Sequence, residues 1–176
     1  MDSKMSTQEF EKIYERYKNM LYRIAFTYLK NNHDVQDILQ EVFMKRFYQA
    51  PPFEDEAHEK YWMIRITINL SKNLLKNFWR QNVGSIDELL ESEDVLQFNF
   101  SESETDLFKN VMSLPDKQKA VIYLHYYEGY HCREIAEILK CKESTVKMRL
   151  KKGRELLKKQ LEREDFLWNK MNTKIW

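Results

Sequence analysis

The sequence predicts an all-α protein with two small helical domains, joined by an acidic flexible linker, the second being a helix-turn-helix domain. Only three Gly and three Pro occur in 176 residues, so the tight turns that separate short strands are few. Apolar residues instead recur at intervals of three and four over long stretches, the pattern of amphipathic helices. We expect domains at 1–81 and 105–163, a linker at 82–104 and a C-terminal tail at 164–176.

The first domain is expected to begin with two helices. Apolar residues follow the three-four spacing from Phe10 to Leu29, and the polar run 31–33 ends this helix. Asp34 is a candidate N-cap for the second helix, with Asp37 near its positive end. The paired prolines at 51 and 52 end it. Its inward face is predicted to hold Val35, Ile38, Leu39, Val42, Phe43 and Phe47.

Residues 60–80 are predicted to form a third helix, although local propensity disagrees. Several of these residues would suit a strand, namely Ile64, Ile66, Thr67 and Ile68. The polar residues decide the matter, because they fall at steps of four, three, four and four and so form one helical stripe. That stripe consists of Arg65, Asn69, Lys72, Lys76 and Arg80.

The second domain is expected to contain a helix over 105–113, another starting at Pro115-Asp116, and a helix-turn-helix over 131–154. In its first helix, the inward residues are Ile135, Ala136, Ile138 and Leu139. The small side chain of Ala136 allows close helix crossing. In the second helix Val146 and Leu150 face inward, and the outward residues are Lys147, Met148, Lys151 and Lys152.

Charge is unevenly distributed along the chain. The whole sequence has a net charge of only +1. Residues 140–163 have a net charge of +7, whereas residues 81–114 have a net charge of −7. The basic run coincides with the second helix of the helix-turn-helix, where phosphate contacts are expected. This combination predicts that the second domain binds DNA.

Composition argues against several other classes of protein. No segment approaches the roughly 20 apolar residues of a membrane span, and the N-terminus lacks a secretory signal. We therefore expect a cytoplasmic protein with two free thiols, Cys132 and Cys141. Together with His125 and His131, these cysteines match no usual zinc spacing, so neither a metal nor a cofactor is predicted. No catalytic constellation accompanies the acidic residues, and we expect no enzyme activity.

Two further groups of residues suggest binding surfaces. An acidic row on the second helix consists of Asp34, Asp37 and Glu41, with Gln40 beside it. It is either helix capping with a solvated face, or a docking surface for a basic partner. The third helix combines its basic stripe with Tyr61, Trp62, Phe78 and Trp79. Cations and rings together suit unpaired nucleic acid, although aromatic residues at helical spacing also form cores.

With these residues in place, the chain resembles the extracytoplasmic-function (ECF) group of bacterial RNA polymerase sigma factors. The resemblance extends from about Phe10 to Leu161. In the first block it rests on residues 34–43 and 62–70. In the second block it rests on residues 113–115, 127–130, 133–136 and 144–150. The family's motifs occur in order, with an acidic linker between the blocks and no room for a middle DNA-binding domain.

The resemblance implies a role for each surface. Residues 1–81 would be a region 2 domain that binds core polymerase, through the β′ clamp helices, with Asp34, Asp37, Gln40 and Glu41. The same domain would hold the melted −10 strand with Arg65, Asn69, Ser71, Lys72, Lys76 and Arg80. Residues 105–163 would be a region 4 domain that reads the duplex −35 element with Arg133, Ser144, Thr145, Lys147, Met148, Lys151 and Lys152. The β flap, promoter DNA and an anti-sigma factor would be further partners of a protein that is monomeric when free.

Some residues depart from the family pattern. Cys132 stands where many relatives have a polar capping residue, which suggests a weaker start to that helix. Thr67 replaces the usual Ala, and the residue types at Met148 and Lys151 predict no base preference. The aromatic tail extends beyond the family core. Two other readings remain open: a stand-alone helix-turn-helix regulator of duplex DNA, and a helical adaptor that binds only protein, which leaves the +7 segment unexplained.

Overall fold

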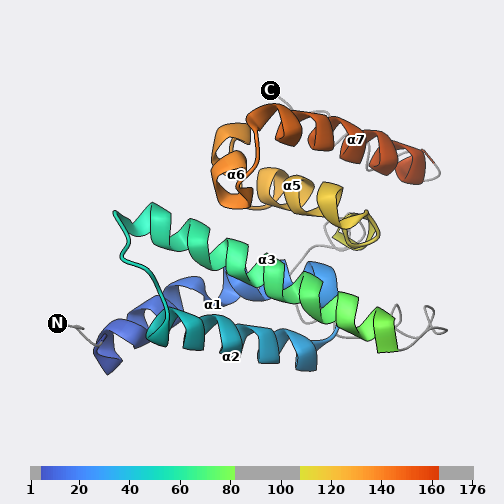
Figure 1. Cartoon of the computed structure of the whole chain (residues 1–176). Coiled ribbons are helices and arrows are strands. Elements are labelled where there is room, and N and C mark those ends of the chain that lie inside the picture. Colours follow the sequence, from blue (N-terminus) through green and yellow to red (C-terminus); the bar gives the residue numbers. More distant parts are fainter. Residues whose placement is uncertain (1–4, 82–107, 163–176) are drawn as a thin grey trace. The chain divides into compact units, whose positions relative to one another are not determined.

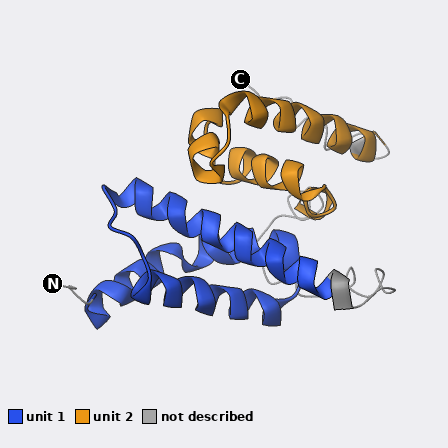
Figure 2. Cartoon of the chain, in the orientation of Figure 1, with its two compact units in different colours: residues 1–94 blue, residues 95–176 orange. Residues whose placement is uncertain are grey.

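A computed structural model of the protein describes residues 5–81 and 108–162 (Figure 1). The chain divides into two compact units, residues 1–94 and 95–176 (Figure 2). Regular structure within the described residues is entirely helical, which confirms the predicted fold class. The predicted linker and the C-terminal tail lie outside the described residues. None of the described helices combines the length and apolar character needed to cross a membrane.

The first unit is a three-helix bundle in which each helix contacts the other two (Figure 1). Its helices are α1 (Thr7–Leu29), α2 (Asn32–Tyr48) and α3 (Glu56–Gln81). The inward faces follow the predicted three-four spacing. The fully buried side chains include Leu21, Ile24, Phe26, Val35, Val42, Met63 and Ile64.

The start of α2 corrects one prediction. Asn31, rather than Asp34, occupies the N-cap position, because its Oδ1 accepts a hydrogen bond from the Asp34 backbone N–H at 2.8 Å. The Asn31 amide also donates to Asp34 Oδ2 at 2.8 Å. The helix therefore begins two residues before Asp34, whose carboxylate lies in the first turn, where the helix dipole favours negative charge.

Helix α3 begins at Glu56, before the predicted start at residue 60. It remains helical through its β-branched segment because that segment supplies the inward face, where Ile64 and Ile68 are buried. Two buried hydroxyls are satisfied within the helix. Thr67 donates to the Met63 carbonyl at 2.9 Å, and Ser71 donates to the Thr67 carbonyl at 2.8 Å. Such bonds to the preceding turn allow small polar residues inside a helix bundle.

A largely buried ion pair joins α2 to α3. The Arg46 guanidinium donates through Nε to Glu59 Oε1, and the two side chains are 18% and 11% exposed. The Arg46 guanidinium also lies 5.1 Å from the centre of the Phe53 ring, which belongs to the connection between the helices. These contacts hold the start of α3, and therefore its basic stripe, in place on the bundle.

The second unit contains a helical segment at 108–112, followed by α5 (Asp116–Tyr126), α6 (Cys132–Leu139) and α7 (Glu143–Leu161). Pro115 immediately precedes α5, as predicted. Helices α5, α6 and α7 each contact the other two. Their shared core includes Phe108, Tyr123, Ile135, Val146, Leu150 and Leu157.

Candidate nucleic-acid interface

Helices α6 and α7 form the predicted helix-turn-helix. Lys140 ends α6 in the left-handed conformation, at φ 49° and ψ 53°. The backbone N–H of Cys141 then donates to the Ala136 carbonyl at 3.0 Å, which closes the turn as in other helix C-termini. Val146 and Leu150 face the core, as predicted. The close packing of these residues fixes the direction of α7.

The start of α6 differs from the prediction. His131 occupies the N-cap position and Cys132 is the first helical residue. The backbone N–H of His131 donates to Glu134 Oε2 at 2.8 Å, one half of a capping box. Cys132 is therefore the first helical residue and not the N-cap, and the weaker start of this helix stays a prediction. Both cysteines are free thiols.

The outward faces of α6 and α7 hold the residues predicted to contact the −35 element. Thr145 is half-buried, and the other six are exposed: Arg133, Ser144, Lys147, Met148, Lys151 and Lys152. Lys147 Nζ lies 2.7 Å from Glu143 Oε1. This hydrogen bond raises the pKa of Lys147 and lowers that of Glu143, so both groups are charged at neutral pH. In a second ion pair on this face, Lys152 Nζ lies 3.8 Å from Glu155 Oε2.

The basic stripe of α3 lies on the surface of the first unit only in part. Asn69 and Lys76 are exposed, whereas Arg65 and Lys72 are half-buried. Burial lowers the pKa of Arg65, although a guanidinium stays protonated in proteins. The Lys72 ammonium lies 6.0 Å from the centre of the Tyr28 ring, which restrains it beside the bundle. The side chain of Arg80 lies outside the described residues.

Ser71 does not belong to this surface. Its side chain is fully buried, and its hydroxyl donates to the Thr67 carbonyl. A strand lying on the surface would not reach it, so the prediction that Ser71 contacts DNA conflicts with the structure. Trp62 is half-buried and its ring meets that of Phe53 edge to face at 5.6 Å. Trp62 therefore has a packing role in the bundle, whereas Phe78 is 36% exposed.

The acidic row lies on the solvent-facing side of α2. The side chains of Asp34, Asp37 and Glu41 are 43%, 62% and 49% exposed, and Gln40 is exposed beside them. Ligand atoms of His33, Asp34 and Asp37 lie within 4.8 Å of one another. Exposed carboxylates commonly group in this way without a metal, and we assign none. The row is an exposed acidic surface of α2, in which Asp37 faces His33 and Glu41 faces Lys45.

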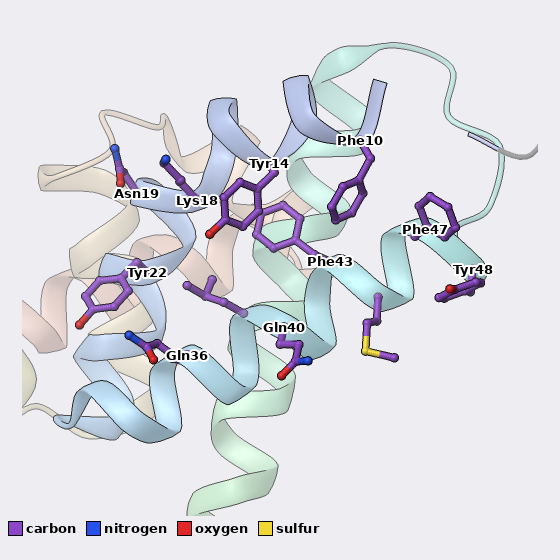
Figure 3. A pocket seen from close by; sticks show the side chains of 12 residues that line it. Phe10, Tyr14, Lys18, Asn19, Tyr22, Gln36, Gln40, Phe43, Phe47 and Tyr48 are labelled. Carbon is purple, nitrogen blue, oxygen red and sulfur yellow. The ribbon is translucent and has the colours of Figure 1, made fainter. Parts of the chain in front are cut away.

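An aromatic groove between α1 and α2 was not predicted from the sequence (Figure 3). It has a volume of about 730 Å³, and Gln36 and Gln40 place it next to the acidic row. Figure 3 shows the rings of Tyr14 and Phe43 side by side, and their centres lie 4.8 Å apart with the ring planes tilted by 55°. The feature of the sequence that could have indicated this groove is an apolar stripe with more aromatic rings than the core of one helix bundle can bury. The other ring-bearing residues that line the groove are Phe10, Tyr22, Phe47 and Tyr48.

Two family models match the chain, one on each unit. Sigma-70 region 2 matches residues 13–81, and Sigma-70, region 4 matches residues 111–157. Among curated proteins, ECF RNA polymerase sigma factor SigW of Bacillus subtilis is 29% identical over 170 residues, covering 86% of this chain and 88% of SigW. RNA polymerase sigma factor SigV of the same species is 31% identical over 154 residues, covering 85% of this chain and 89% of SigV.

Solved structures show the same fold. The sigma factor RpoE of Bartonella quintana, in a co-crystal with the anti-sigma factor NepR, has a TM-score of 0.73 and 20% identity, covering 90% of this chain and 99% of RpoE. CnrH, in complex with the cytosolic domain of CnrY, has a TM-score of 0.68 and 19% identity, covering 90% and 91% of the two chains. The family models on both units and the curated relatives show that the chain belongs to the ECF group of sigma-70-type RNA polymerase sigma factors.

Proposed function

We propose that this sigma factor directs core polymerase to promoters through three separate surfaces. The observation that supports this division most strongly is the distribution of charge between the two units. The first unit has the acidic row on α2 and the basic stripe on α3, and the second has a helix-turn-helix with a basic outward face. Each surface has the charge that suits a different partner.

The acidic row would dock on the β′ clamp helices of core polymerase. Asp37 and Glu41 are one turn apart and both are exposed, so they can meet a basic partner without refolding of α2. Like charges brought together at an interface cost several kcal/mol, which makes this contact selective for a basic surface. The β flap is the expected second polymerase contact. None of these roles requires catalysis by the sigma factor.

The α3 stripe would hold the unpaired strand of the −10 element. Asn69 is exposed on the outer face of the helix, and an amide can bind the edge of a flipped-out base. Lys72 and Lys76 lie one and two turns further along α3, where they can follow the phosphates of a single strand. In this part of the proposal Asn69 contacts a base of the open complex, whereas Lys72 and Lys76 contact only its phosphates.

The outward face of α7 would enter the major groove of the −35 element. Recognition helices contact base edges mainly with their N-terminal residues, and these include Ser144, Lys147 and Met148. The cations further along would contact phosphates, which position the protein without reading sequence. A simple repressor needs this surface but neither of the two surfaces on the first unit.

The same sigma factor is expected to act in the cytoplasm and to have an anti-sigma partner. Among structures of the same fold, the sigma factor RpoE is in complex with the anti-sigma factor NepR, and CnrH is in complex with the cytosolic domain of CnrY. An anti-sigma factor would cover polymerase-binding or DNA-binding surface. The free protein is expected to be a monomer.

Gel-shift binding of a promoter duplex, with and without core polymerase, separates this proposal from a stand-alone regulator. We expect tight, sequence-specific binding only with core polymerase, because the −10 and −35 contacts must act together. Equal sequence-specific affinity without polymerase would favour the regulator instead.

A further inference from the structure

Met148 has an unusual position for an apolar residue. Its side chain is 65% exposed, and within the described residues of the second unit it is the one large apolar side chain that is exposed. Its neighbours on the outward face of α7 are all polar or charged. They are Ser144, Lys151 and Lys152, which are also exposed. Neither core packing nor solubility accounts for an apolar side chain at this place.

The geometry of α7 aims Met148 directly away from the core. The inward residues Val146 and Leu150 each lie two positions from Met148, which is a rotation of about 160° around the helix axis. Ser144 and Lys152 lie within about 40° of Met148, and Lys151 within about 60°. When α7 enters a groove with its outward face, Met148 therefore points to the base edges, and the lysines lie beside it.

The major groove presents one apolar group to a protein, the C5 methyl of thymine. A thioether chain has no charged donor for a base, but it is flexible and packs well on an apolar partner. We propose that Met148 reads one T·A base pair of the −35 element by packing on the thymine methyl. This inference rests on the proposed function, and it assigns a base identity that the residue type alone did not predict.

Removal of single methyl groups tests the proposal. Reconstituted holoenzyme with the full-length sigma factor first selects duplexes from a pool randomised over the −35 element. Each conserved thymine of the selected element is then replaced by deoxyuridine, which removes only the methyl group. With the wild-type protein we expect deoxyuridine at one position to reduce affinity about fourfold. This factor corresponds to the burial of one methyl group.

Substitutions in α7 connect that loss to one side chain. In Met148→Ala the affinity for the thymine duplex should fall by a similar factor, and the change to deoxyuridine at that position should have no further effect. Lys151→Ala provides the contrast, because loss of a phosphate contact should weaken binding to thymine and deoxyuridine duplexes by the same factor. Because Met148 is exposed, Met148→Ala should leave the thermal midpoint of unfolding unchanged.

Three results would overturn the proposal. One is a selected −35 element that contains no conserved T·A pair. Another is a deoxyuridine effect of the same size in wild-type and Met148→Ala proteins. The third is an equal loss of affinity for both duplexes in Met148→Ala, which would assign Met148 to a protein contact or to packing. If the holoenzyme selects no element at all, the sigma role itself fails, so the two failures are distinguishable.

Discussion

Gly153 of α7 lies so close to the side chain of Ile122 of α5 that no space remains between them for a side-chain atom on residue 153. A Cβ placed on Gly153 would be 2.7 Å from Ile122 Cγ1 and 3.0 Å from Cδ1. Glycine within a helix costs about 1 kcal/mol relative to alanine, so its presence here indicates a packing requirement. Since α7 is the candidate recognition helix, this contact with α5 sets how α7 lies on the second unit.

Gly153→Ala should destabilise the protein, although alanine is the better helix former. Ile122 is buried, so its side chain cannot move away without displacing its neighbours, and overpacking of this kind costs about 1–3 kcal/mol. Urea unfolding of the full-length protein would measure the loss. The matched test is Gly153→Ala in an Ile122→Ala background, because the shorter side chain at position 122 leaves space for the new Cβ. Relative to Ile122→Ala alone, the added Gly153→Ala should leave the free energy of unfolding unchanged or raise it. A higher unfolding midpoint for Gly153→Ala alone would contradict this account.

Loss of Glu59 should destabilise the first unit more than loss of an exposed acid. Glu59→Ala leaves the Arg46 guanidinium largely buried without its carboxylate, and we expect a cost of about 2–3 kcal/mol, below the range for fully buried pairs. Arg16 and Glu56 form a pair at 2.9 Å with side chains 49% and 64% exposed, so Glu56→Ala is the control, expected within about 1 kcal/mol of wild type. In urea unfolding, equal costs for Glu59→Ala and Glu56→Ala would contradict this view of the buried pair.

Charge reversal of the acidic row should weaken binding to core polymerase. The double variant Asp37→Lys/Glu41→Lys places cations one turn apart against a basic partner, which should reduce affinity at least tenfold at physiological salt. Circular dichroism should show unchanged helix content, because both side chains are exposed. Glu11→Lys/Glu15→Lys makes the same change of charge at the same spacing on α1. Wild-type affinity of the α2 variant, or equal weakening by the α1 variant, would remove the row from the interface.

Asn69 and Lys147 should affect different steps of promoter opening. Asn69→Ala should leave the closed complex nearly intact and reduce the open complex, because its amide would bind a base only after melting. Lys147→Ala should instead weaken closed-complex binding and reduce its salt dependence. Filter binding measures the first step, and permanganate reactivity of unpaired thymines measures the second.

The exposed amide of Asn77, two turns along α3 from Asn69, provides a control for side-chain loss on the same helix. Asn77→Ala should behave as wild type in both assays. Asn69→Ala can be tested on a duplex template and on a pre-opened bubble template. If the permanganate reactivity of unpaired thymines equals that of wild type on both, then Asn69 has no role in holding the strand.

The helices and their inward faces could be predicted because their signals are local. The spacing of apolar residues identified the inward positions Val146 and Leu150, and the polar stripe on α3 outweighed the strand propensity of Ile64 and its neighbours. The helix-turn-helix was predicted for the same reason, since it depends on two short periodic segments and the polar turn between them. In each case a short window of sequence contains the whole signal.

Other features depend on contacts that a linear pattern does not record. Asn31 and Asp34 are both good N-cap residues, and only the path of the chain after α1 selects Asn31. Ser71 lies between two predicted DNA-contacting residues, but packing turns it inward, where the preceding turn satisfies its hydroxyl. The aromatic groove lies on a side of α1 and α2 that no residue of α3 lines. Gly153 could be explained only once its distance to α5 was known.

Run-off transcription with core polymerase tests the central claim most directly. Genomic DNA of the source organism serves as template, and purified core polymerase is assayed with and without the full-length sigma factor. The account expects discrete transcripts that begin downstream of a common pair of −35 and −10 elements and that depend on the sigma factor. They should be lost with Asp37→Lys/Glu41→Lys and kept with Glu11→Lys/Glu15→Lys. Absence of any sigma-dependent transcript, together with polymerase-independent binding to specific duplex sites, would contradict the account.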